Sequence, residues 1–389
     1  MKELIKRFLA RPFLRMLSGA FGHQLRVALP ILAVVVLIVT LLAWRRVGGA
    51  MVAWCWLAPG LVAAAVLAIL ASLPILGISY GHWWHLALPL VLAALLATLG
   101  LLILLSLLPG SGSRGVAARL LSLVMALGLG VYAYAAIAEP LLIEVSRVQI
   151  KVPSLPAGSP LLKIVQISDL HIERMTRRDR AMVRLVAQLD PDVLLISGDL
   201  TSEYRDAPAL DALHEVLAGL HARYGVYTVT GNVDPKGKIA EVAAGTDVRV
   251  LENEVARLDW PGSPVYILGL PTASHLSQDR AAFRQLLASA PGDGMLILLY
   301  HYPDLFDDAR AAGIDLYLAG HTHGGQILLT FIGAPVKSSI SNRWYERGWF
   351  PWDGGGMYVS RGIGFEGLGI PRVRFLSRPE IASITISSP

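Results

Sequence analysis

The sequence predicts an integral membrane protein with an N-terminal α-helical transmembrane region and a C-terminal α/β sandwich domain. Two observations support this prediction. The first third of the chain contains four long apolar segments almost free of charge, and the rest alternates short strand-like segments with helical patterns. We place a basic amphipathic segment at residues 1–25, the spans at 26–139, a linker at 140–160 and the sandwich domain at 161–389.

Basic and apolar residues alternate at the start of the chain. This spacing can form an amphipathic helix that lies on an anionic membrane surface. A disordered tail that only directs membrane topology is an equally good interpretation of the same residues. The basic members are Lys2, Lys6, Arg7, Arg11 and Arg15.

The four apolar segments are each close to the roughly 20 residues that a helix needs to cross a bilayer. A soluble domain can bury one such helix, but four in succession favour membrane spans. Because the first segment leads into further spans, we expect no cleavable signal peptide. The predicted spans are Val27–Trp44, Met51–Leu73, Leu86–Leu108 and Val116–Ala138.

The distribution of basic residues favours a C-terminal domain on the cytoplasmic face of a bacterial inner membrane. The N-terminal residues together with Arg26 are more basic than the alternate loops, and four spans return the chain to its starting side. The connection at residues 74–85 has no Lys or Arg and would also be cytoplasmic, which leaves a periplasmic domain as the alternative.

Composition favours a lipid bilayer over nucleic acid as the partner of this protein. Residues 140–160 contain four prolines and are typical of a short tether, which would hold the domain near the lipid bilayer and suit an amphiphilic substrate. The net charge of +5 is mostly accounted for by membrane topology, and no motif indicates nucleic-acid binding. Cys55 is the single cysteine, which excludes an intrachain disulfide and an all-cysteine zinc site.

Five strand-like segments of the C-terminal part each stop at residue types that bind metals. The carboxyl ends of neighbouring strands in an open α/β sheet converge on one crevice, so these residues are expected to form one site. The helical patterns 178–188 and 209–222 would cover the sheets. The strand-like segments 163–168, 193–197, 226–230, 295–300 and 314–319 precede, in that order, Asp169 with His171, Asp199, Asn232, His301, and His321 with His323.

Each of these groups alone also fits an ordinary turn. An Asp-x-His after a strand is usually a helix cap, and Gly-Asp and Gly-Asn are common turn dipeptides. The stretch Gly320–Gln326 is more specific, because two imidazoles two residues apart on a glycine-rich loop suit a packed core poorly. All five groups in order favour a metal site.

This ordered set resembles the calcineurin-like metallophosphoesterase superfamily, in particular its bacterial membrane-associated branch, from Leu161 to the C-terminus. The resemblance implies two divalent metal ions, for which mixed oxygen and nitrogen donors favour Mn, Fe or Zn over Ca. It assigns the first ion to Asp169, His171, Asp199 and His323, and the second to Asp199, Asn232, His301 and His321, with Asp199 bridging. Two such ions would activate a water for attack on phosphorus.

The chain departs from the superfamily pattern at Val233, where a histidine usually contacts the substrate and protonates the leaving oxygen. Valine cannot donate a proton, so we expect a substrate whose leaving group needs little protonation. The hydrolases of UDP-2,3-diacylglucosamine are similar in lacking this histidine. His275, Tyr302 or Arg361 could replace the lost group, and Asp234 would orient Asn232 or a substrate water.

These observations predict a membrane-anchored phosphodiesterase or pyrophosphatase that acts on a phosphorylated lipid such as a nucleotide-diphospho-lipid. The predicted catalytic residues are Asp199, Asn232, Asp234 and Arg361. Two alternatives are a membrane sensor that binds metal but has little activity, and a transporter that the C-terminal domain regulates. Few ionisable residues lie within the spans, which argues against the transporter.

Overall fold

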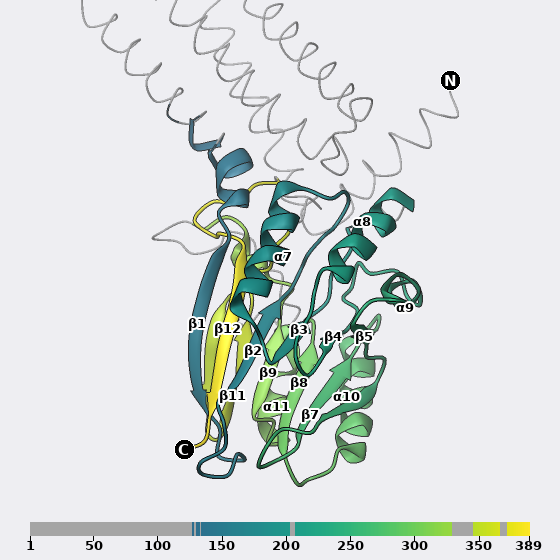
Figure 1. Cartoon of the computed structure of the whole chain (residues 1–389), viewed down its shortest axis with the longest axis vertical. Coiled ribbons are helices and arrows are strands. Elements are labelled where there is room, and N and C mark those ends of the chain that lie inside the picture. Colours follow the sequence, from purple (N-terminus) through teal and green to yellow (C-terminus); the bar gives the residue numbers. More distant parts are fainter. Residues whose placement is uncertain (1–126, 128–129, 133, 203–206, 329–344, 366–371) are drawn as a thin grey trace, which may run out of the picture. The chain divides into compact units, whose positions relative to one another are not determined.

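The computed structural model describes residues 127, 130–132, 134–202, 207–328, 345–365 and 372–389 (Figure 1). The predicted amphipathic segment and the predicted spans lie outside the described residues, except for the last part of the fourth span. None of the helices in the described ranges has the length and apolar character needed to cross a membrane. Nearly all described residues belong to one compact unit, Tyr132–Glu366 with Arg372–Pro389.

Two six-stranded sheets form the centre of this unit. The first sheet has the strand order β1-β12-β2-β3-β4-β5, with β1 at Glu144–Lys151, β12 at Glu380–Ser387, β2 at Leu162–Ile167, β3 at Val193–Ile196, β4 at Val226–Thr228 and β5 at Val248–Val250. The second has the order β10-β11-β9-β8-β7-β6, with β10 at Gly348–Trp352, β11 at Gly355–Val359, β9 at Leu316–Ala319, β8 at Met295–Tyr300, β7 at Val265–Leu270 and β6 at Glu254–Leu258.

Helices cover the outer faces of the two sheets, which gives an α/β sandwich (Figure 1). Three apolar layers hold it together: one between the sheets, one beneath α7 and α8, and one beneath α10 and α11. The α-helices are α7 at Arg177–Leu189, α8 at Ala207–Ala218, α9 at Lys238–Ala243, α10 at Leu276–Ser289 and α11 at Phe306–Ala311. Shorter helical turns are η2 at Tyr134–Ala138, η3 at Glu139–Leu141, η4 at Pro303–Leu305 and η5 at His323–Gly325.

The predicted C-terminal α/β fold is confirmed. The five strand-like segments are β2, β3, β4, β8 and β9, and the two helical patterns are α7 and α8. The start of α7 is well defined, because Thr176 accepts a hydrogen bond from the Asp179 backbone while the Asp179 carboxylate accepts one from the Thr176 backbone. Such a capping box satisfies backbone donors that the first turn leaves unpaired.

The predicted tether at residues 140–160 is wrong over most of its first half. Residues 144–151 form β1, which pairs in parallel with β12 and adds Ile150 to the core between the sheets. Prolines on both sides conceal this eight-residue edge strand in the sequence, although its apolar residues fit a half-exposed strand. The catalytic domain therefore begins before residue 161.

The direction of β1 matters for the position of the site. β1 is parallel to β12 and β12 is antiparallel to β2, so β1 begins at the edge where β2 ends. Ser146 of β1 and Gln166 of β2 both pair with Ala382 of β12. Glu144 is thus level with Ser168, the residue just before the first predicted metal ligand.

Candidate metal centre

The carboxyl ends of β2, β3, β8 and β9 bring the predicted ligands together. Two groups form, and within each group the donor atoms all lie within 4.8 Å of one another. Their members are Asp169, His171 and His323 in the first group and Asp199, His301 and His321 in the second. The seventh predicted ligand, Asn232, places its Oδ1 3.1 Å from His301 Nε2.

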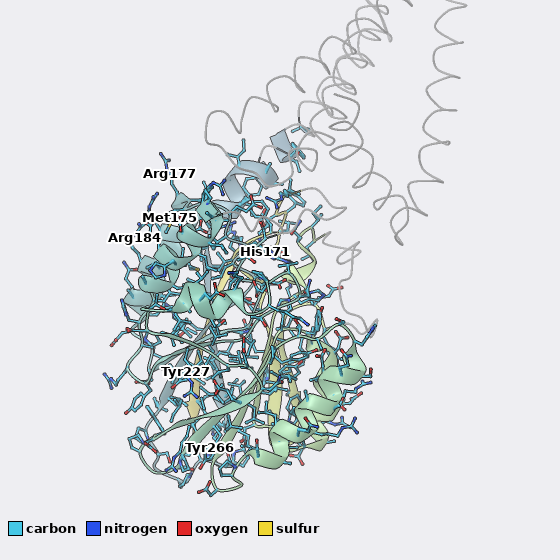
Figure 2. The ribbon with its side chains drawn as sticks, turned by 90° about the vertical axis from the view of Figure 1, so that its right-hand side faces the viewer. His171, Met175, Arg177, Arg184, Tyr227 and Tyr266 are labelled. Atoms are coloured by element: carbon cyan, nitrogen blue, oxygen red, sulfur yellow. The ribbon has the colours of Figure 1, made fainter. Side chains whose placement is uncertain are left out.

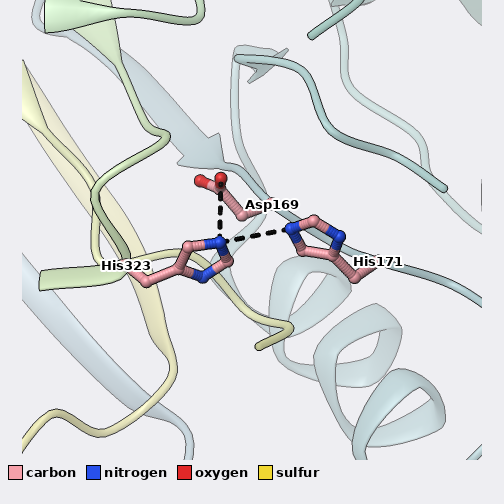
Figure 3. A group of neighbouring side chains, drawn as sticks. All are labelled: Asp169, His171 and His323. Atoms are coloured by element: carbon pink, nitrogen blue, oxygen red, sulfur yellow. Dashed lines mark hydrogen bonds and ion pairs between the residues drawn. The ribbon is translucent and has the colours of Figure 1, made fainter. Parts of the chain in front are cut away.

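In the first group, two imidazole nitrogens face each other (Figure 3). His171 Nε2 lies 3.2 Å from His323 Nε2, which in turn lies 3.6 Å from Asp169 Oδ1. Burial, followed by the nearby His171 and Arg374, lowers the pKa of His323 well below its ordinary value. A neutral imidazole can donate its lone pair to a cation, so this buried arrangement fits a metal ion.

Asp199 lies between the two groups. Its Oδ2 is 3.1 Å from His301 Nε2 in the second group and 3.9 Å from His171 Nε2 in the first. Burial alone would raise the pKa of Asp199, but His301 and His171 together hold it below its usual range. One buried carboxylate that contacts both groups is what two neighbouring cations require.

A hydrogen bond at Nδ1 orients the His301 ring. The Nδ1 atom lies 2.8 Å from the Ser197 carbonyl oxygen, to which its N–H can donate, so that Nε2 faces Asp199 and Asn232. Burial lowers the pKa of His301, but the charge and hydrogen bond of Asp199, with the charge of Asp169 and the Ser197 carbonyl, together raise it to about 9. A cation at this point would neutralise the same carboxylate. The donor set of the second group therefore also fits a metal ion.

The backbone at the ligands is unusual. Five ligand residues adopt left-handed φ angles, which non-glycine residues rarely do and which concentrate at functional sites. They are Asp169 at 50°, His171 at 46°, Asp199 at 52°, His321 at 70° and His323 at 50°. The chain thus turns sharply just after β2, β3 and β9, which directs several side chains from one short loop toward the same point.

Glycines leave room for the ligand carboxylates. A Cβ atom on Gly231 would collide with Asp199 Oδ1, and one on Gly320 would collide with Asp169 Oδ2. A Cβ on Gly362 would lie 2.6 Å from the Asp169 Cβ. These glycines are required by close approach to the site rather than by turn formation alone.

We expect Gly231→Ala to weaken metal binding by about 10- to 100-fold, because the added methyl group must displace the Asp199 carboxylate. Manganese titration of the full-length protein measures the effect. Gly292→Ala is the matched control, since nothing lies within 4 Å of a Cβ added there. Equal affinity of the two variants would contradict the assignment of Asp199.

Asp234 holds the loop that carries Asn232. Its carboxylate accepts hydrogen bonds from the backbone N–H of Gly231 at 2.8 Å and of Thr201 at 3.0 Å. Burial, followed by the Asp199 charge, raises the pKa of Asp234 to about 6. Asp234 therefore acts on Asn232 through the backbone, and the predicted contact with a substrate water is not favoured by these bonds.

Arg361 forms ion pairs with two carboxylates that are not predicted ligands. Its guanidinium lies 3.3 Å from Glu144 Oε2 and 3.1 Å from Glu380 Oε1. The predicted catalytic role of Arg361 needs a cation directed at substrate, and these contacts direct the charge toward β1 and β12 instead. A motif match identifies the residue type but not the partners that later strands supply.

We expect Glu380→Gln to destabilise the domain by about 2 kcal/mol at pH 7, because a hydrogen-bonded charge is lost beside Arg361. Burial would raise the pKa of Glu380, but Arg361 lowers it below its ordinary value of 4.5. The stabilisation is therefore complete above that pH and is lost as the pH falls through the folded pKa. Thermal unfolding against pH should be steeper in acid for the wild type than for the variant. Glu254→Gln, at a partly exposed carboxylate paired with Arg249, is the control, and identical pH profiles would contradict the prediction.

Three other residues that support the site carry no sequence motif. Arg374 is fully buried and donates to the carbonyls of Arg361, Gly362 and Ser377 at 2.8, 3.1 and 2.9 Å. The Ser377 hydroxyl donates to the His323 carbonyl at 3.1 Å. The Tyr302 ring packs edge-on against His321 with centroids 4.5 Å apart. Only Tyr302, adjacent to His301, was within reach of sequence reasoning.

Of the other predicted replacements for the missing histidine, His275 is an exposed residue at the N-cap of α10. Val233 itself is buried, and its backbone N–H donates to Asp199 Oδ1 at 3.1 Å. The main chain at this position thus contributes to the site even though the side chain offers no proton.

Comparison with known proteins identifies the family. Residues 162–325 match the family described as calcineurin-like phosphoesterase. The chain is 31% identical over 268 residues to the uncharacterized metallophosphoesterase YkuE of Bacillus subtilis, an alignment that covers 67% of this chain and 91% of YkuE. The chain belongs to the calcineurin-like metallophosphoesterase family. It is therefore a metal-dependent phosphoesterase, and the family uses divalent metal ions.

Two further members of the calcineurin-like family are informative. The UDP-2,3-diacylglucosamine pyrophosphatase LpxG of Chlamydia trachomatis is 27% identical over 305 residues, covering 62% of this chain and 89% of LpxG. A transmembrane protein with metallophosphoesterase domain from Danio rerio is 29% identical over 286 residues, covering 68% of this chain and 62% of that protein.

Proposed function

We propose that this metallophosphoesterase is anchored in the bacterial inner membrane and cleaves a phosphodiester or pyrophosphate bond of a lipid-linked substrate. The observation that supports two-metal hydrolysis most directly is the position of Asp199 Oδ2, which contacts His301 of one ligand group and His171 of the other. Two divalent ions held there would stabilise developing negative charge on phosphoryl oxygens and lower the pKa of water.

The predicted ligands form two sets, one for each metal ion, that share Asp199. Asp169, His171 and His323 would hold one, His301, His321 and Asn232 would hold the other, and Asp199 would serve both. The His321 backbone N–H donates to both Asp169 carboxylate oxygens at 3.1 Å, which fixes that carboxylate relative to the second group. Mn, Fe and Zn all accept this donor set.

Val233 indicates the kind of leaving group that the site can release. Its side chain can neither protonate nor hydrogen-bond a departing oxygen, and general acid catalysis typically contributes about 10²- to 10⁴-fold to hydrolysis. A nucleotide or phosphate leaving group needs less of this help than an alkoxide. We therefore favour a phosphoric anhydride, and the pyrophosphatase name of the LpxG relative supports this choice.

The short connection between the predicted spans and β1 supports a substrate with a lipid part. Ala138, the last residue of the predicted fourth span, precedes the start of β1 by six residues, a separation of at most about 22 Å even when extended. β1 starts at the sheet edge where β2 ends and the ligands begin. The site would thus lie close to the cytoplasmic membrane surface.

A comparison of two substrates tests the proposal. The full-length protein, loaded with Mn in lipid nanodiscs, is given a nucleotide-diphospho-lipid and the same compound without acyl chains. We expect kcat/KM for the lipid to be at least about tenfold higher, since acyl chains concentrate it at the membrane. Equal values would reject the lipid-linked substrate. Bound metal without turnover of either compound would favour a sensor.

A further inference from the structure

We propose that the end of the domain carrying the metal centre also bears a docking face for anionic lipid, and this inference rests on the proposed membrane attachment. The lipid-docking face has a basic part and an apolar part. The basic part consists of Arg177, Arg180 and Arg184 on α7, and the apolar part of Ile137, Leu141, Leu142 and Leu376.

The basic part is an exposed stripe on one side of α7. Arg177, Arg180 and Arg184 are three and four residues apart, which places them on one side of a helix, opposite the buried Met182 and Val186. Figure 2 shows Arg177 and Arg184 along the outer edge of the domain. None of the ion pairs formed among the described residues involves these three arginines. They are therefore available to an anionic partner.

The apolar part is exposed to an extent unusual for large side chains. Ile137 is 68% exposed, Leu141 50%, Leu142 42% and Leu376 46%. Single exposed leucines are ordinary, but these four belong to two segments that bond to each other. The Arg374 backbone N–H donates to the Ala135 carbonyl, and the Ser377 backbone N–H donates to the buried Glu139 carboxylate at 2.7 Å.

The two parts lie side by side, because η3 contacts α7. A basic surface next to apolar side chains suits the boundary between lipid headgroups and acyl chains. The predicted fourth span ends at Ala138, one residue after Ile137, so the chain beside the face would enter the membrane. Binding of a protein partner would not require such a span next to the face. We therefore commit to the anionic surface of the membrane in which the chain is anchored.

The face is coupled to the metal centre beneath it. Ser377, whose backbone holds the Glu139 carboxylate, donates its hydroxyl proton to the carbonyl of the ligand His323. On the other side, α7 begins six residues after the ligand His171. Docking would thus bring the end of the domain that carries the ligands to the lipid surface and favour a substrate whose phosphates lie at headgroup level.

A fluorescence experiment on the full-length protein tests the docking face without substrate or metal. Cys55→Ser removes the native thiol, Leu376→Cys carries an environment-sensitive dye, and the protein is placed in nanodiscs with headgroup-labelled quencher lipid. We expect stronger quenching in phosphatidylcholine with phosphatidylglycerol than in phosphatidylcholine alone, and a loss of the difference at high salt. Three arginines acting together should shift the docking equilibrium by about 10²-fold.

Charge reversal supplies the control. R177E/R180E/R184E should abolish the response to phosphatidylglycerol, whereas R249E/R257E/R284E, with the same charge change on other exposed arginines, should preserve it. Equal quenching in both lipid mixtures, or an equal loss in both triple variants, would overturn the docking face. Since the readout involves no hydrolysis, lipid-substrate turnover without lipid-dependent quenching would refute this inference and leave the proposed function intact.

Discussion

Asp199→Asn should reduce kcat/KM for an activated phosphodiester by about 10³-fold, a loss comparable to removing a principal charge-stabilising group. The substitution keeps the shape of the side chain but replaces the anion that contacts both His301 and His171. Without that shared charge the two ions would repel each other at full strength. Steady-state kinetics at saturating Mn and elemental analysis of the protein measure activity and metal content together.

Asp259→Asn is the matched control for this experiment. Asp259 is an exposed carboxylate that pairs with Arg257, and it lies far from every predicted ligand in the sequence. The same change of Asp to Asn is thus made outside the metal centre. We expect wild-type activity in Asp259→Asn and the loss of about 10³-fold only in Asp199→Asn. An Asp199→Asn protein that retains two ions and normal turnover would show that another group bridges the metals.

Val233→His should raise turnover of a diester with a poorly stabilised alkoxide leaving group by about 10²-fold, at the lower end of what general acid catalysis contributes. The same substitution should change hydrolysis of a pyrophosphate little, because that leaving group departs as a stable anion. The position is favourable, since the Val233 backbone already contacts Asp199 Oδ1. Parallel kinetics on the two substrate classes measure the ratio.

Val233→Asn distinguishes proton donation from simple polarity at this position. The asparagine side chain can hydrogen-bond a leaving oxygen but does not protonate it near neutral pH. A gain confined to Val233→His supports the leaving-group explanation. An equal gain in both variants, or none in either, would show that the missing histidine does not determine the substrate preference.

Local sequence patterns predicted the parts of the fold that depend on local burial. The segments that became β3 and β8 are runs of apolar residues with both faces covered, and such runs are recognisable without knowing their neighbours. β1 was missed because its residues are half exposed and gain their structure from pairing with β12, more than 200 residues later. Pairing over that distance leaves no local signal.

In the metal centre, too, some features could be predicted from local sequence and others depend on distant segments. The ligand types and their order were readable, because each ligand follows a strand end. The left-handed backbone at Asp169 and Asp199 was not, since strained conformations are maintained by the surrounding structure and not by the residue itself. The contacts of Arg361 with Glu144 and of Ser377 with His323 join distant segments, and they could be found only in three dimensions.

The order of strands in the first sheet has a consequence for synthesis of the protein. β12, at Glu380–Ser387, lies between β1 and β2 although it is synthesised after both, so β1 has no partner strand and β2 has only β3 until β12 has been made. The exposed flanks of β1 and β2 would attract other unpaired strands during that interval. Pairing of β1 with the sheet therefore waits for β12, and a premature stop codon just before Glu380 should release an aggregation-prone chain.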